Sequence, residues 1–322
     1  MKDEANVKEV KERYADYLLK ITGVTGVGYN SSIIIYVEEL TPQLTAFLPR
    51  QLEGVPVKIV RTGRIQPLPL QVAPAYAVYS ERTKRMRPSP GGVSCGHPFI
   101  SAGTLSARAV DRKSGEVLGL SNAHVIAAAW GEMQVGQRGD PVLQPGPVDG
   151  GTLDDKIGEL DRWIPVEPEP EPNLVDAAAF RSNQLREDII ELGKPDRLIE
   201  PSPGMTVLKS GRTSGVTYGR ILDAHATILV EGWGRAKFVD QIIIRPAILS
   251  PGDSGSFIGQ ADTLRAVGLG HAGSTEVSVA CHAEHVERLL NVEIAPPVGY
   301  ASTLAMLGVW GGLGVASLAL MR

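Results

Sequence analysis

The sequence is poor in several features that would fix its class directly. Its 322 residues include only two cysteines, Cys95 and Cys281, and neither has a second thiol nearby or metal-ligand spacing, so we expect two buried free thiols in a reducing compartment. A formal net charge of -4 and the lack of a large Lys/Arg cluster argue against nucleic-acid binding. The charged amino terminus lacks the apolar run of a signal peptide. These absences predict a cytoplasmic protein.

Glycine and proline, by contrast, are abundant, with 36 and 23 residues, which indicates many turns and short strands. Residues 1–65 predict a small α/β module that opens with an amphipathic helix. Residues 66–92 are proline-rich and carry a basic cluster, which predicts a solvated linker that a processing protease could reach. From 93 to 292, short β-rich runs broken by glycine predict an antiparallel barrel or sandwich.

The carboxyl-terminal segment, residues 293–322, has a different composition. Its run "LAMLGVWGGLGVASLALM" holds 18 apolar or small residues, the lower limit for crossing a bilayer, and Gly308 and Gly312 form a GxxxG pair. Two alternatives are open for this tail: it inserts in a membrane, or it docks on its own domain or on another subunit of a homo-oligomer. The predicted cytoplasmic protein could thus be membrane-associated.

The stretch "ILSPGDSGSFIG" places Ser254 between glycines, as in a tight turn or in the nucleophile loop of a hydrolase. A serine hydroxyl needs a histidine to take its proton and a carboxylate to orient that histidine. His124 stands where an apolar strand meets a short helix, in "LGLSNAHVIAAA". Asp176 is a single acid inside the apolar strand "NLVDAAAF", where its burial requires hydrogen-bond donors such as a histidine ring. Taken singly, each residue also fits a structural role.

Together, the order His124, Asp176, Ser254 and the motifs "SNAHVIA", "VDAAAF" and "PGDSGS" resemble the chymotrypsin-like (trypsin-like) serine proteases. This resemblance implies a mainly β fold, a double β-barrel with the triad in the cleft between barrels and a closing helix at "AEHVERLLN". More closely, "PGGVSCGHPFISAGTLSARAVD" and "LKSGRTSGVTYGRI" are similar to a bacterial and plant group of trypsin-like peptidases that includes the plant narrow-leaf protein. In that group a module similar to residues 20–65 precedes the protease domain.

The resemblance also implies a role for each site residue. Ser254 is the nucleophile, His124 the general base and then acid, and Asp176 the group that orients His124. The backbone N–H groups of Gly252 and Ser254 form the oxyanion hole, and Asp253 points inward to a partner that the sequence does not identify. No metal or organic cofactor is implied.

The specificity pocket departs from that of the basic-specific members. Ile248 stands at the pocket base, where such an enzyme carries an aspartate, so a small or apolar side chain before the cleaved bond is favoured. His271, in the pocket-wall motif "GLGHAGS", either binds an acidic or polar side chain or packs inside the fold. The predicted function is a serine endopeptidase with a protein or peptide substrate. The alternative is a protease-fold scaffold or binding protein with a latent site, assembling through its N-terminal module and apolar tail.

Overall fold

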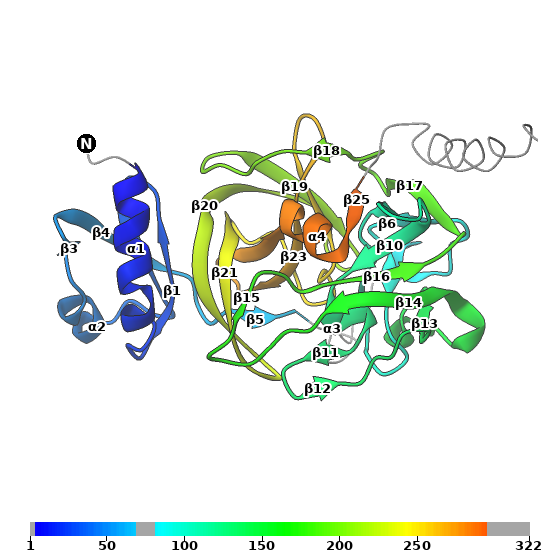
Figure 1. Ribbon diagram of the computed structural model, residues 1–322, viewed down its shortest axis with the longest axis horizontal. Helices are drawn as coiled ribbons and strands as arrows, with labels where there is room; N and C mark the ends of the chain where they lie inside the picture. Colours follow the sequence, from blue (N-terminus) through cyan, green and yellow to red (C-terminus); the bar gives the residue numbers. More distant parts are fainter. Residues whose placement is uncertain (1–3, 69–80, 295–322) are drawn as a thin grey trace, which may run out of the picture.

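The computed structural model of the protein describes residues 4–68 and 81–294. Over these residues the chain is mainly β, with a few helices packed against the strands (Figure 1). The α-helices are α1 (Glu4–Leu18), α2 (Pro42–Phe47), α3 (Ala123–Ile126) and α4 (Ala283–Leu290). The short 3-10 helices are η1 (Glu81–Thr83), η2 (Pro147–Asp149) and η3 (Leu153–Asp155).

The carboxyl-terminal half of the protein contains a closed antiparallel β-barrel. Its strands are β19 (Thr206–Gly211), β20 (Gly215–Gly232), β21 (Gly234–Arg245), β22 (Phe257–Gln260), β23 (Arg265–Gly273) and β24 (Ser278–His282). Each strand pairs with the next in the order β19, β20, β21, β24, β23, β22, and β22 pairs back with β19. Because successive side chains in a strand point to opposite faces, Ile242 and Ile244 enter one core while Ile243 enters another.

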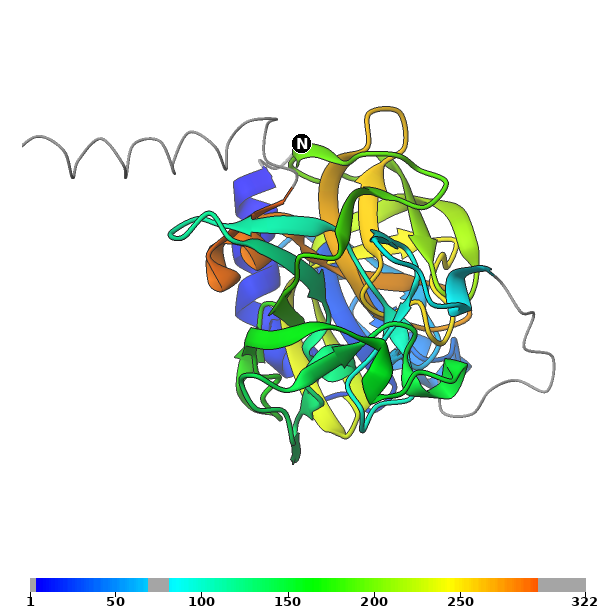
Figure 2. The same ribbon diagram turned by 90° about the vertical axis from the view of Figure 1, so that its right-hand side faces the viewer.

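The preceding residues form a six-stranded antiparallel sheet, toward which Figure 2 looks. Its order is β13 (Pro141–Leu143), β14 (Lys156–Ile164), β16 (Ala177–Arg181), β10 (Val117–Ser121), β9 (Arg108–Asp111) and β25 (Val292–Ile294). Helix α4 joins this sheet to the barrel, because Val286 and Leu290 share an apolar core with Leu120 and Phe257. The predicted mainly β fold class is confirmed.

Several short strands complete the described structure. They are β6 (Ser89–Gly91), β7 (Ser94–Cys95), β8 (Gly103–Thr104), β11 (Ala129–Trp130), β12 (Met133–Gln134), β15 (Pro172–Asn173), β17 (Leu185–Ile189) and β18 (Asp196–Leu198). β7 pairs with β8, and β6 runs parallel to β17. These pairings hold the loops that surround the two larger β structures.

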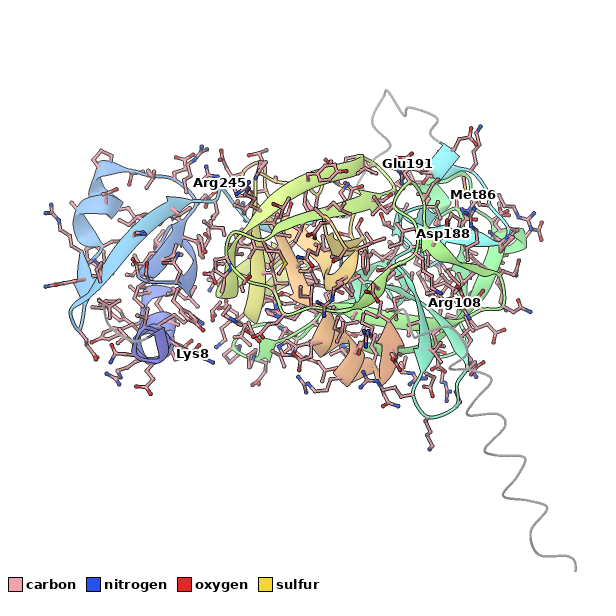
Figure 3. The ribbon with its side chains drawn as sticks, turned by 90° about the horizontal axis from the view of Figure 1, so that it is seen from above. Lys8, Met86, Arg108, Asp188, Glu191 and Arg245 are labelled. Atoms are coloured by element: carbon pink, nitrogen blue, oxygen red, sulfur yellow. The ribbon has the colours of Figure 1, made fainter. Side chains whose placement is uncertain are left out.

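The N-terminal residues form a helix packed on strands that are continuous with the barrel. The strands are β1 (Val24–Tyr29), β2 (Ile33–Val37), β3 (Gln51–Leu52) and β4 (Val55–Arg61), and β1 pairs with β20. The buried ammonium of Lys11 on α1 donates to Thr227 Oγ1 of β20 at 2.7 Å. A second contact joins the module to the barrel through Glu276, which pairs with Arg61 of β4 and with Arg245 of β21. Arg245 is labelled in Figure 3. The module therefore packs directly onto the barrel.

One local expectation was wrong. The basic cluster of residues 66–92 is not simply solvated: Arg82 is buried and donates to the Gly92 carbonyl at 3.0 Å and to the Ser210 hydroxyl. His225 lies within β20, where the pairing with β21 shifts register between Asp223 and Ala226. These bulges allow a polar residue in the middle of a long strand.

The predicted apolar tail lies outside the described residues from position 295 onward. Among residues 4–68 and 81–294, no helix has both the length and the apolar character needed to cross a bilayer.

Candidate active site

The pairing of two neighbouring strands brings His124 and Asp176 together. β10 and β16 run antiparallel with Ser121 opposite Ala178. The residues that follow β10 and those that precede β16 therefore lie at the same end of this strand pair. His124 is in α3, directly after β10. Its ring Nδ1 hydrogen-bonds Asp176 Oδ2, and its backbone N–H donates to Asp176 Oδ1 at 3.1 Å. One carboxylate thus fixes both the backbone and the ring of His124.

Asp176 is itself held by two neighbours and is fully buried. Asn122 Nδ2 donates to the Asp176 carbonyl at 2.6 Å, and the Asp176 backbone N–H donates to Cys281 Sγ at 3.3 Å. Burial raises the pKa of the Cys281 thiol and raises that of Cys95 to about 12. Both cysteines are free and buried, as predicted, and Cys281 has a supporting place behind the candidate triad.

Ser254 lies in the loop between β21 and β22, which turns at two glycines in left-handed backbone conformation. Gly252 has φ 95° and Gly255 has φ 92°. A Cβ at position 252 would lie 2.4 Å from Thr213 Oγ1, and one at 255 would lie 2.3 Å from the Thr104 carbonyl. The glycine at 252 is therefore required by backbone conformation and close packing, in addition to the approach of a substrate carbonyl that the sequence suggested.

Thr104, in the strand β8, connects this loop to the first half of the domain. Its backbone N–H donates to the Ser254 carbonyl at 2.7 Å, and its hydroxyl donates to the Gly252 carbonyl at 2.9 Å. The same hydroxyl accepts from the Arg212 backbone N–H at 3.0 Å. Nothing in the sequence around "AGTLSA" identifies this positioning role.

Asp253 points inward, and its partner is Lys209 of β19. The Lys209 ammonium lies 3.1 Å from Asp253 Oδ2, and both side chains are fully buried. Burial lowers the pKa of Lys209, while the Asp253 carboxylate opposes that change. Asp253 also accepts from the backbone N–H groups of Thr213 at 2.8 Å and Ser250 at 2.9 Å. An internal lysine thus supplies the cation for this inward carboxylate.

In the described part of the chain, no hydrogen bond joins Ser254 to His124. Ser254 Oγ donates to the His271 carbonyl at 3.3 Å, and His124 Nε2 is buried without a hydrogen-bond partner in the described part of the chain. The Gly252 N–H donates to the Leu68 carbonyl at 2.8 Å. The structure thus brings His124 and Asp176 together and does not join Ser254 to them.

The two predicted pocket residues are both buried but differ in their surroundings. Ile248 belongs to an apolar cluster with Leu68 and Leu249. His271 bonds through Nε2 to Gln241 Oε1 at 2.9 Å and lies 4.7 Å from the ring of Phe238. Burial lowers the pKa of His271 to about 4, so its ring is neutral at pH 7. Of the two roles that the sequence left open, this is the packed arrangement.

A second histidine cluster, which the sequence did not predict, surrounds Asp240. The ring of His225 bonds Asp240 Oδ1 at 2.6 Å, His285 bonds Oδ2 at 2.6 Å, and His282 Nε2 bonds the Ala224 carbonyl at 2.6 Å. The ligand atoms of His225, Asp240 and His282 lie within 4.8 Å of one another, as in a metal site. Protein partners already satisfy these atoms, and the Asp240 hydrogen bond raises the pKa of His225.

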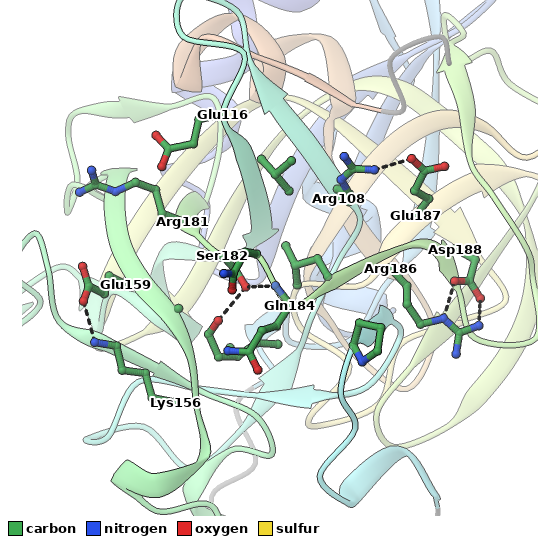
Figure 4. Close-up of a pocket in the computed structure, with 16 residues that line it drawn as sticks. Arg108, Glu116, Lys156, Glu159, Arg181, Ser182, Gln184, Arg186, Glu187 and Asp188 are labelled. Atoms are coloured by element: carbon green, nitrogen blue, oxygen red, sulfur yellow. Dashed lines mark hydrogen bonds and ion pairs between the residues drawn. The ribbon is translucent and has the colours of Figure 1, made fainter. Parts of the chain in front are cut away.

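A surface pocket of about 1210 Å³ lies beside β14, β16 and β17, away from the candidate triad (Figure 4). Its charged side chains pair with one another, as in Arg108 with Glu187 and Lys156 with Glu159. It contains none of His124, Asp176 and Ser254.

Comparison with known proteins gives similarity in structure only. No family model and no curated protein matches the sequence. Solved structures similar to this chain include Nocardiopsis protease (16% identity, 64% of this chain and 98% of that one, TM-score 0.47) and Thermobifida fusca protease A (14%, 64% and 97%, 0.45). Another is Cellulomonas bogoriensis chymotrypsin (15%, 64% and 97%, 0.44). Such distant similarity says nothing about activity or substrate, and the narrower resemblance to the bacterial and plant peptidase group stays a prediction.

Proposed function

We propose that the protein is a serine endopeptidase that cuts peptide bonds through an acyl-enzyme. The observation that carries this proposal is the Asp176–His124 pair, which stands beside a serine loop whose Gly252 N–H already holds a peptide carbonyl. Ser254 would attack the substrate carbonyl, His124 would take and then return the proton, and the Gly252 and Ser254 N–H groups would stabilise the oxyanion. The residues in these roles need no metal or organic cofactor.

A fluorophosphonate probe tests this proposal on the full-length chain. We expect covalent labelling that is abolished in Ser254→Ala and retained in Ser202→Ala, the same change at an exposed serine. Thermal unfolding of each variant checks that the fold is intact. A folded native chain that shows no Ser254-dependent labelling after long incubation would contradict the assignment.

A scaffold or binding protein with a latent site is the second candidate. It is favoured by the fully buried Ser254 and His124 and by the Ser254 hydroxyl that donates to the His271 carbonyl. In this case the N-terminal module and the apolar tail would supply contacts to partners, copies of the chain or a membrane. Fractionation of cells that express the chain with or without residues after Asn291 tests the predicted cytoplasmic location and membrane contact.

A further inference from the structure

Residues 65–68, directly after the N-terminal module, add a short strand to β23 and contact the loop that carries Ser254. β5 (Gln66–Pro67) pairs antiparallel with the end of β23, with Pro67 opposite Ala272 and Gln66 opposite Gly273. Gln66 is exposed whereas Pro67 and Leu68 are buried. Extended peptides commonly bind proteins in this way, by main-chain pairing with a strand and alternating side-chain pockets.

The carbonyl of Leu68 is bound by the loop that carries Ser254. It accepts a hydrogen bond of 2.8 Å from the Gly252 N–H, one of the two donors assigned to the oxyanion hole. Ser254 is two residues further along the same loop. A peptide carbonyl held by an oxyanion donor beside a nucleophile is the arrangement of a bound substrate.

The side chain of Leu68 fills an apolar pocket. It is 8% exposed and belongs to the cluster that contains Ile248, the predicted pocket base, and Leu249. A Cβ built on Gly273 would lie 3.5 Å from Leu68 Cδ1, so Gly273 borders the Leu68 side chain. The residues that share this cluster are apolar, which suits an aliphatic side chain such as that of leucine.

Two residues before Leu68, Pro67 and Ile65, also contact the barrel. A Cβ on Gly232 would lie 2.5 Å from Pro67 Cγ, so Pro67 packs against that glycine. The Ile65 carbonyl accepts from the Glu231 N–H at 3.0 Å. Main-chain contacts therefore extend along the whole segment.

The bond that is presented in this way resists cutting. The residue after Leu68 in the sequence is Pro69, so the carbonyl held by Gly252 belongs to an X–Pro bond. Proline carries a ring carbon in place of the amide hydrogen, which crowds the nitrogen that His124 must protonate as it departs.

We propose that residues 65–68 are a built-in pseudosubstrate that inhibits the enzyme, and that the pocket holding Leu68 selects leucine or a similar aliphatic residue before the bond cut in other proteins. This inference rests on the proposed endopeptidase function. It names both the resting state of the site and its preferred substrate class: extended segments with an aliphatic residue at the cleavage position.

The first test weakens the segment in the full-length chain. Leu68→Ala removes three buried carbons, which lowers the equilibrium constant for binding of the segment in the cleft by about 50-fold. We expect fluorophosphonate labelling, and hydrolysis of the fluorogenic peptide acetyl-Ile-Gln-Pro-Leu-aminomethylcoumarin, to speed up by about 10- to 50-fold relative to the native chain. Leu153→Ala, the same change at a side chain that is 68% exposed, is the matched control and keeps the native rate.

The outcomes separate the two proposals. Equal, Ser254-dependent labelling of the native and Leu68→Ala chains would overturn the pseudosubstrate and leave the hydrolase in place. A folded Leu68→Ala chain with no labelling would overturn the hydrolase itself and the inference with it.

A second variant leaves Leu68 in its pocket and so does not depend on the stability of Leu68→Ala. In Pro69→Ala the held bond becomes an ordinary peptide bond. Ser254 Oγ then adds to the Leu68 carbonyl carbon, the bond to the nitrogen of residue 69 breaks as His124 protonates that nitrogen, and water releases a chain that ends at Leu68. Mass spectrometry should find this fragment, and its absence in Pro69→Ala with Ser254→Ala is the control. An uncut Pro69→Ala chain that still reacts with fluorophosphonate would overturn the inference.

The third test concerns selectivity. With the Leu68→Ala chain and the peptides acetyl-Ile-Gln-Pro-X-aminomethylcoumarin, leucine at X should exceed alanine by about 10-fold and lysine or aspartate by at least about 100-fold, because the pocket is apolar. The fastest hydrolysis at lysine or aspartate would overturn the pocket assignment.

Discussion

The buried pair of Lys209 and Asp253 offers a sharp test of how the serine loop is held in shape. Lys209→Met keeps an unbranched side chain one heavy atom shorter and removes its charge. Removal of one member of a buried ion pair costs about 3–5 kcal/mol. Asp253 also accepts hydrogen bonds from backbone N–H groups in the native chain, so we expect the lower end, about 3 kcal/mol. This corresponds to a melting temperature lower by about 6–12 °C.

The same substitution should impair catalysis, because Asp253 lies between the two residues whose N–H groups form the proposed oxyanion hole. Loss of one such donor lowers kcat by about 10²- to 10³-fold. The assay is hydrolysis of the leucine peptide by chains that also carry Leu68→Ala, with calorimetry on the same samples. Lys113→Met, the same change at an exposed lysine, is the control.

A double-mutant cycle separates the cost of an unpaired charge from a general packing defect. Asp253→Asn added to Lys209→Met removes the unpaired carboxylate and should restore about 1–2 kcal/mol of stability. Unchanged melting of Lys209→Met, or simple addition of the two single effects, would refute the view that Lys209 neutralises Asp253.

Three further predictions concern the site. Asp176→Asn should lower kcat by about 10⁴-fold without unfolding the chain, because the His124 ring loses the partner that fixes its tautomer; steady-state kinetics check this. Thr104→Val leaves the buried Arg212 N–H without its acceptor and should cost about 1–3 kcal/mol in unfolding free energy, measured by denaturant titration. The pKa of His271 is lowered from 6.5 to about 4, so the unfolded chain binds more protons between these values and stability falls by roughly 3 kcal/mol as pH drops through them. The His271→Gln chain should lack that slope in melting experiments from pH 7 to 4.

The sequence predicted the candidate site best where a charged residue interrupts an apolar strand and strand pairing then brings its partner close. A lone acid in the apolar run "NLVDAAAF" had to find a donor, and the antiparallel pairing of β10 with β16 places it against His124. The same signal was present at Lys209, a single lysine in the strand "TVLKSG", and would have identified the partner of Asp253. An isolated charge inside an apolar strand predicts an oppositely charged neighbour, since burial without one is costly.

The segment after residue 65 could not be predicted in this way. Its prolines indicate a linker, and Pro67 fits a strand only at an edge, where its missing N–H is not needed. The two-residue strand β5 forms because β23 provides a partner, and the burial of Leu68 depends on Ile248 and Leu249, which are far away in the sequence. Contacts of this kind are set by tertiary structure and leave no periodic pattern in the segment itself.

The tether between the N-terminal module and residues 65–68 decides how strongly the segment can compete with substrates. Just before the segment, Arg61 pairs with Glu276 at 3.1 Å, and the Ser274 hydroxyl donates to the Thr62 carbonyl. The packed module thus holds the segment next to β23, the strand with which it pairs. Its binding is intramolecular, with an effective concentration on the order of millimolar or above. A free peptide must pay its own ordering and association entropy. Free acetyl-Ile-Gln-Pro-Leu should therefore inhibit the Leu68→Ala chain only at about millimolar concentration, and weak inhibition by this peptide is compatible with tight closure of the native chain.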